Sequence, residues 1–174
     1  MEETQRPTTG KYALIYGLLT GAAGIAFSLM LHFMDMQYDQ SASKQIISTL
    51  ILIAFIILAI YQFKRANLSF ISLSEALKIG IGASAVAAIV TILYLLVYIN
   101  AIEPDFHEKL AEVTRNGMRE QNPALTTEQI DNAIAMQSKF FWITYPVILV
   151  FNMFIGFVIS LITGVILKKK APEY

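Results

Sequence analysis

Four long apolar runs constrain the fold of this chain more than any other feature of its sequence. They cover residues 12–33, 46–63, 79–99 and 146–167, and apart from a histidine near the end of the first run they contain no charged or titratable acid, lysine, arginine or histidine. At 1.5 Å per residue each run would form a helix of about 27 to 33 Å, which matches a hydrocarbon core of ~30 Å. We therefore expect an all-α protein, a polytopic transmembrane four-helix bundle forming one membrane domain over 1–174.

Composition supports this class and excludes several others. Of the 174 residues, 56% are hydrophobic and 15% are charged, which is more apolar surface than a soluble domain of this size buries. The 13 basic and 13 acidic residues cancel, so we expect no nucleic-acid partner. The chain has no cysteine, which excludes disulfides, thiolate zinc sites and cysteine nucleophiles.

The basic residues predict how the chain threads the membrane. With four spans, Lys and Arg divide between the two sides as eight against five. Cytoplasmic connections carry the excess of Lys and Arg, so we expect both termini in the cytoplasm. The eight are Arg6, Lys11, Lys64, Arg65, Lys78, Lys168, Lys169 and Lys170, and the five on the outer side are Lys44, Lys109, Arg115, Arg119 and Lys139.

The outer segment 100–141, between the third and fourth spans, has the pattern of a helical hairpin. Pro104 suits a first helical turn, and Glu103, Asp105 and Glu108 favour the positive end of a helix dipole. Each helix carries a short apolar stripe that we expect to be buried against the other stripe or on the membrane surface. The stripes are Phe106, Leu110 and Val113 in the first helix, and Ile130 and Ile134 in the second.

Two capping boxes indicate where helices begin. Ser72 is followed three residues later by Glu75, and Thr126 by Gln129. In this motif a hydroxyl and a carboxylate or amide satisfy the free N–H groups of a helix start. The first box predicts that the helix of the third span begins about two turns before its apolar run. The alternative is that Glu75 and Lys78 form a binding pair.

The stretch HEKLA at 107–111 resembles a broken zinc-protease motif. A zinc-binding His-Glu-x-x-His needs its histidines one turn apart, and the second position here is Ala111. We therefore interpret the stretch as a helix start in water and predict no catalytic residues, no cofactor and no metal. One metal hypothesis stays open, because the threading puts His32 and His107 on the same side near carboxylates that could complete a zinc site.

One strongly polar residue, Asn152, lies deep in a span. We interpret it as a hydrogen-bonding link between helices rather than as a ligand for a solute. Intramembrane ionisable groups mark proton relays and ion paths, so their absence from the runs argues against a proton-driven pump.

Small residues recur at helical spacing in three of the runs. Such residues let helix backbones approach closely, which is how helices pack in lipid. We expect them to pack the bundle internally, and the alternative is a homodimer formed through Gly17 and Gly21. The predicted packing positions are Gly17, Gly21, Gly24, Gly80, Ser84, Gly156, Ser160 and Gly164.

Four stretches resemble one known family. FISLSEALKIG at 70–80, IEPDFHEKL at 102–110, TTEQIDNAIAMQSKFF at 126–141 and GFVISLITGVILKK at 156–169 are similar, in this order, to short four-span membrane proteins of Bacteroidota catalogued only as a domain of unknown function. The resemblance implies an integral inner-membrane protein of a Gram-negative bacterium with the hairpin in the periplasm. It brings no catalytic residues.

The function that we expect is non-catalytic: an accessory or scaffolding subunit whose surroundings are the lipid bilayer and another membrane protein or a second copy of itself. Two alternatives stay open. A faint similarity between ALIYGLLTG at 13–21 and ALKIGIGAS at 76–84 is compatible with a small carrier or channel for a neutral or lipid-like solute. A membrane metalloenzyme would use His32 and His107.

Overall fold

The computed structural model describes residues 7–38 and 41–169. Within these residues the chain forms six α-helices and two short helical turns without a β-strand, which confirms the predicted all-α fold. Arg6 and Lys170, two residues of the threading prediction, lie outside the described residues. The elements are α1 (Thr9–Phe33), α2 (Ala42–Ala66), α3 (Leu73–Val97), the π-helical turn η1 (Tyr98–Ile102), α4 (Phe106–Gln121), α5 (Thr127–Lys139), the 3-10 turn η2 (Phe141–Ile143) and α6 (Thr144–Leu167).

Four stretches of helix are long and apolar enough to cross a membrane, so the chain has the architecture of a multi-pass membrane protein. They are Thr9–Phe33, Ala42–Ala66, Leu73–Ile102 and Phe141–Leu167. Each contains one predicted apolar run and extends past it at one end or at both.

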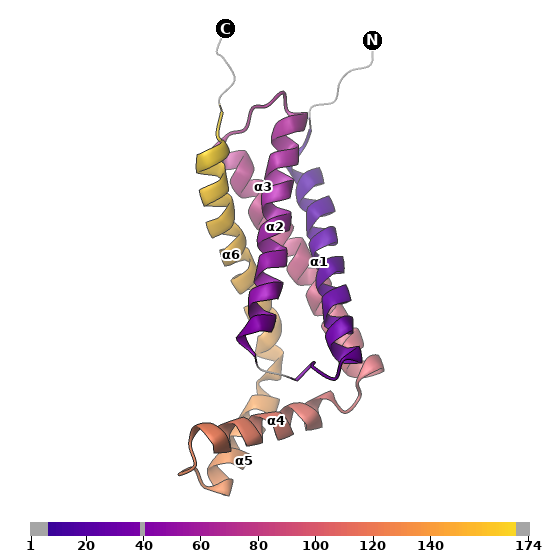
Figure 1. The fold of residues 1–174 in the computed structure, drawn as a ribbon, viewed down its shortest axis with the longest axis vertical. Coiled ribbons are helices and arrows are strands. Elements are labelled where there is room, and N and C mark those ends of the chain that lie inside the picture. Colours follow the sequence, from indigo (N-terminus) through magenta and orange to yellow (C-terminus); the bar gives the residue numbers. More distant parts are fainter. Residues whose placement is uncertain (1–6, 39–40, 170–174) are drawn as a thin grey trace.

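The four long helices form a bundle in which α3 packs against the other three (Figure 1). Its largest interfaces are with α1 and α6, while α2 lies across α1, α3 and α6. We call the end where α1 begins and α6 ends the terminal end, and the opposite end, which carries α4 and α5, the hairpin end. α1 therefore runs parallel to α3, whereas α2 and α6 run antiparallel to it.

The largest apolar core lies in the half of the bundle next to the terminal end. Ile60 and Phe63 of α2 pack there against Ile79 of α3, and all three are almost completely buried. Tyr12 of α1 packs edge-on against the ring of Phe63, with 5.4 Å between the ring centroids. The other core residues are Leu52, Ile56, Ala59, Ile71 and Ala76.

The α2–α3 connection at the terminal end confirms the first capping box. Ser72 Oγ accepts a hydrogen bond from Glu75 N, and the Glu75 carboxylate accepts one from Ser72 N, so α3 begins at Leu73. The Glu75 carboxylate therefore caps the N-terminus of α3. Ile71 and Lys169 exchange two backbone hydrogen bonds of 3.1 and 3.0 Å, which hold the chain after α6 beside the chain before α3.

The segment between α3 and α6 is a helical hairpin, as predicted, and α4 runs across the direction of the bundle (Figure 1). The second capping box is present at Thr126 and Gln129. Ile130 and Ile134 are buried, α4 and α5 pack against each other, and Arg115 of α4 forms a 2.6 Å ion pair with Asp131 of α5. The α5 stripe is therefore buried, as predicted, whereas the α4 stripe is only half-buried, with the Phe106 ring packed on Tyr98 and Phe141.

The start of α4 differs from the prediction. Pro104 lies in a turn, and the helix begins at Phe106 with Asp105 at its N-cap. The reason is that the chain leaves η1 with Glu103 turned into the protein, so the helix can begin only after the chain has turned back.

Candidate functional site

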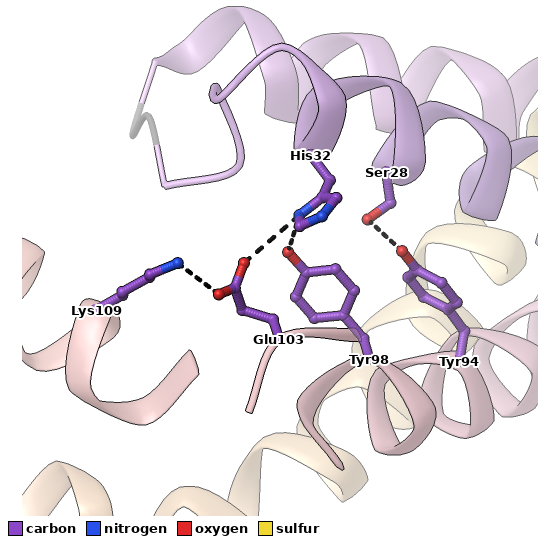
Figure 2. Close-up of polar contacts among 6 residues, drawn as sticks. All are labelled: Ser28, His32, Tyr94, Tyr98, Glu103 and Lys109. Atoms are coloured by element: carbon purple, nitrogen blue, oxygen red, sulfur yellow. Dashed lines mark hydrogen bonds and ion pairs between the residues drawn. The ribbon is translucent and has the colours of Figure 1, made fainter. Parts of the chain in front are cut away.

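The polar residues that the fold brings together lie at the hairpin end, where α1, η1 and α4 meet (Figure 2). His32 comes from the last turn of α1, Tyr98 from η1, Glu103 from the residue after η1, and Lys109 from α4. We call these four residues the Glu103 cluster. They join α1 to η1 and α4, and His32 is 66 residues before Tyr98 in the sequence.

Glu103 is the centre of the cluster, with 8% of its surface exposed. One carboxylate oxygen, Oε1, accepts a hydrogen bond from Lys109 Nζ, and the other, Oε2, lies 3.6 Å from His32 Nδ1. His32 Nδ1 is also 2.8 Å from Tyr98 Oη, at hydrogen-bonding distance. A buried carboxylate needs partners of this kind, since leaving it unpaired would cost several kcal/mol.

The π-helical turn η1 sets the direction in which Glu103 points. Glu103 N donates to Tyr98 O at 2.8 Å, a bond that spans five residues instead of the four of an α-helix. Compared with an α-helical turn, the wider turn places one more residue between the two bonded residues, Tyr98 and Glu103. Tyr98, the first residue of the turn, is almost completely buried, and its hydroxyl faces α1.

Aromatic rings surround the start of α4. The Phe106 ring packs edge-on against Tyr98 and Phe141, at centroid distances of 6.1 and 6.0 Å, and is tilted against Tyr38 at 6.0 Å. His107 packs on Phe141 at 4.9 Å. These contacts connect α4 to η1, to the α1–α2 connection and to η2.

Burial and neighbouring charges shift the pKa values of Tyr38 and Lys109 at this end. Burial, followed by the nearby carboxylates of Glu103 and Asp105, raises the pKa of Tyr38 from 10.0 to about 12. The hydrogen bond to Glu103 raises the pKa of Lys109 above its ordinary value. Tyr38 is therefore neutral and Lys109 charged throughout the physiological range.

The Glu103 cluster attaches the hairpin to the bundle. Lys109 is in the first turns of α4, so its ion pair with Glu103 links the hairpin to the end of α3. His32 adds a link to α1, and a nearby hydrogen bond of 3.3 Å from Tyr94 Oη to Ser28 Oγ links α3 to α1 again (Figure 2). The arrangement holds the hairpin in a defined position relative to the spans.

The two histidines of the metal hypothesis lie in different surroundings. His32 is bonded to Tyr98 and faces Glu103, whereas His107 packs against the rings of Phe106 and Phe141. Across residues 7–38 and 41–169, no three side chains of the types that bind metals are grouped as ligands.

The hydrogen bond of Asn152 contradicts the prediction that this residue links two helices. Its Nδ2 donates at 2.8 Å to the carbonyl of Ile148, one turn earlier in the same helix. The side chain therefore does not link two helices in the way that the sequence suggested. A span has no water with which an amide can bond, so the nearest carbonyl of its own helix serves instead.

The small residues of α3 and α6 face one another where these two helices approach closely. A methyl group added at Gly156 would overlap Ser84 and would lie 2.8 Å from the carbonyl oxygen of Gly80. One added at Gly80 would overlap Ser160. Gly164 meets Ala76 in the same way, at 2.8 Å. These residues are buried, as expected for internal packing.

On α1 the predicted packing positions divide into two groups. Gly17 and Gly21 are buried against α3, where an added methyl group would lie 2.7 Å from Ala83 O and from Val90 Cβ, respectively. This face is occupied by α3 and so is not free for the homodimer of the alternative hypothesis. Gly24 has no neighbouring atom within 4 Å of an added methyl group, so it does not belong to the interface.

The sequence prediction missed Tyr98 and Tyr38 as members of the hairpin-end site, and only its metal hypothesis counted Glu103 among the carboxylates near His32. It placed Glu103 in solvent, near the start of α4. A signal was present: Glu103 comes four residues after an apolar run, His32 is next to last in another run on the same side, and Lys109 lies six residues after Glu103. Charges that adjoin membrane ends are costly unless they are paired, and this could have suggested the pairing.

Comparison with known proteins gives one match. No curated protein and no solved structure matches the chain significantly. The model of a family described as "Protein of unknown function (DUF4199)" matches residues 15–169, which include most of the first span, the other three spans and the hairpin. The chain therefore belongs to the DUF4199 family.

Proposed function

We propose that this protein is a non-catalytic accessory or scaffolding subunit of the inner membrane of a Gram-negative bacterium. Both termini would be cytoplasmic, and the α4–α5 hairpin would lie in the periplasm and contact another membrane protein or a second copy of the chain. No nucleic acid and no cofactor enter this proposal.

The distribution of charge supports the orientation. Lys11 at the start of α1, Lys64 and Arg65 at the end of α2, Lys78 near the start of α3, and Lys168 after α6 all belong to the terminal end. Positively charged residues that flank spans favour the cytoplasmic side.

The observation that carries the proposal is the construction of the hairpin. Its α5 stripe is buried and its α4 stripe half-buried, the Glu103 cluster connects it to the bundle, and its outer surface is charged. Within α4 and α5, Met136 is the one large apolar side chain that is exposed, at 61%. A methionine side chain adapts its shape to a partner, so we propose Met136 as a contact residue of this surface.

Single cysteines test the orientation, because the chain has none of its own. Ala124, between α4 and α5, and Ala66, at the end of α2, are both exposed and are a matched pair. In intact cells a membrane-impermeant maleimide should label Ala124→Cys and spare Ala66→Cys. The reverse pattern would place the hairpin in the cytoplasm and overturn the proposed orientation.

Copurification tests the scaffolding role. From native membranes in mild detergent, we expect the full chain to carry one stoichiometric partner, and Met136→Glu to lose most of it. Glu128→Gln, also exposed on α5, is the control and should retain the partner. A chain that purifies alone, or a partner retained equally by Met136→Glu, would contradict the proposed role of the hairpin.

A further inference from the structure

Leu68, in the α2–α3 connection, occupies a backbone position that favours glycine. Its φ is 52°, and that of Ser69 is 65°. Ser69 N donates at 2.9 Å to Lys64 O, the six-to-one bond of a Schellman motif that ends a helix. In this motif the residue at the position of Leu68 is usually glycine, because the Cβ of other residues crowds the backbone. The end of α2 would therefore form more easily with glycine at this position.

The side chain of Leu68 is also unusually exposed, at 83%. It follows Lys64 and Arg65, so it lies past the apolar part of the span, near the level where a bilayer meets water. Leu68 is neither buried nor in a backbone conformation that suits leucine, so its side chain does not stabilise the described fold. We infer that its role is a contact outside the chain.

The surroundings of Leu68 are strongly basic. Among the described residues, Glu75 is the one carboxylate of the terminal end, and it caps α3. The ion pairs between described residues lie at the hairpin end. The terminal segments beyond the described residues add three acids and two bases to the sequence, so this end stays basic. Its described basic residues are Lys11, Lys64, Arg65, Lys78, Lys168 and Lys169.

Lys169 is held beside this connection. Its backbone exchanges two hydrogen bonds with Ile71, and its ammonium lies 5.6 Å from the centroid of the Phe70 ring. Lys168 precedes it and is exposed. Two lysines thus adjoin the connection that carries the exposed leucine.

We propose that the terminal end binds anionic phospholipids, with Leu68 inserted among the acyl chains just below the headgroups and the lipid phosphates bound by Lys168 and Lys169. An apolar side chain beside clustered cations is the pattern of interfacial membrane contacts. An acidic protein surface would match the charge, but the position of Leu68 beside the end of a span favours lipid. This inference does not depend on the proposed role of the hairpin.

The first experiment locates Leu68 relative to the bilayer. The Leu68→Cys variant of the full chain is labelled with an environment-sensitive dye and reconstituted into vesicles of phosphatidylcholine, with or without phosphatidylglycerol. We expect the emission to shift to the blue, and to shift further with phosphatidylglycerol, while the same dye on Ala124→Cys changes little. Emission typical of water in both kinds of vesicle would exclude insertion and leave an acidic protein as the occupant.

The second experiment separates binding from folding. In detergent micelles, phosphatidylglycerol should raise the unfolding temperature of the full chain more than phosphatidylcholine does. Leu68→Gly should be at least as stable as the natural chain without lipid, because glycine relieves the backbone, yet its apparent affinity for phosphatidylglycerol should fall about tenfold.

The lysines are tested in the same assay. Replacement of Lys168 and Lys169 by Gln should reduce the affinity for phosphatidylglycerol by about fivefold for each charge removed. Lys139→Gln, at the hairpin end, is the matched control and should bind as the natural chain does. Equal stabilisation by the two lipids, or unchanged phosphatidylglycerol affinity in Leu68→Gly, would overturn the proposal.

Discussion

The two ends of the bundle are held together by different means. Towards the terminal end, glycine, alanine and serine let α3 approach α1 and α6 closely, and apolar side chains of α2 fill the space between them. At the hairpin end, rings and a paired carboxylate join the elements. The first kind of packing depends on shape, and the second depends on charge and hydrogen bonding.

This difference reflects the surroundings of each region. Inside a bilayer no hydrophobic force drives helices together, so close backbone packing must supply the attraction. Near the membrane surface, water and charged groups are available, and ionised side chains can be paired without the full cost of hydrocarbon burial. Each region should therefore respond to a different kind of substitution.

The largest expected effect is at the α3–α6 contact. Gly156→Leu would force an isobutyl group into Ser84 and the backbone of Gly80, where no flexible neighbour can yield. We expect a loss of about 3 kcal/mol in the free energy of unfolding, measured by denaturation in detergent micelles.

Gly24 provides the matched control for that substitution. It lies in the same kind of apolar helix, with no atom near an added methyl group, so Gly24→Leu should change stability by less than about 0.5 kcal/mol. Equal destabilisation by the two substitutions would show that close packing of small residues does not hold this region together.

A smaller effect is expected inside the hairpin. Ile130 is 1% exposed, and Ile130→Ala should destabilise the α4–α5 pair locally by about 2 kcal/mol. Hydrogen exchange should then accelerate in α4 and α5 but not in α2 or α3. Exchange that accelerates throughout the chain would mean that the hairpin and the bundle unfold as one unit.

The Glu103 cluster should give a more local effect still. Glu103→Gln removes the charge that pairs with Lys109, and we expect amide exchange at the start of α4 to accelerate roughly tenfold. Glu108→Gln, exposed on the same helix, is the control. If both variants exchange alike, the attachment depends on the aromatic contacts of Phe106 and not on charge.

The smallest effect is a dependence on alkaline pH. Tyr38 ionises at about 12 in the folded chain and near 10.0 in an unfolded one, so its contribution to stability is complete below pH 10 and is lost as the pH rises towards 12. The raised pKa of Lys109 acts in the same direction. The difference in tyrosinate absorbance between the natural chain and Tyr38→Phe should develop near pH 12. Its development near pH 10 would contradict the burial of Tyr38.

The sequence was informative about the fold for physical reasons. The length of the apolar runs, the two capping boxes and the small-residue spacing each depend on local pattern, and the corresponding elements are observed. Gly24 and Asn152 show the limit of such patterns. Spacing cannot tell which of several glycines on a face meets a neighbour, nor which acceptor an amide will choose.

The hairpin-end site was less accessible to sequence reasoning. His32, Tyr98 and Glu103 come together only after α1 and α3 are packed side by side and η1 has turned the chain inward. The sequence YINAI of η1 contains no residue that marks a π-helical turn, so the sequence did not show that the chain turns Glu103 inward.

The turn η1 also determines the direction in which the hairpin leaves the end of α3. A single residue advances an α-helix by roughly 100° about its axis. Deleting one residue from Tyr98–Ile102 would therefore let α3 continue regularly and rotate the hairpin by about a quarter turn about the axis of α3, away from His32. The extra residue of the π-helical turn therefore sets which side of the bundle the hairpin lies on, and this orientation does not depend on the stability of the hairpin itself.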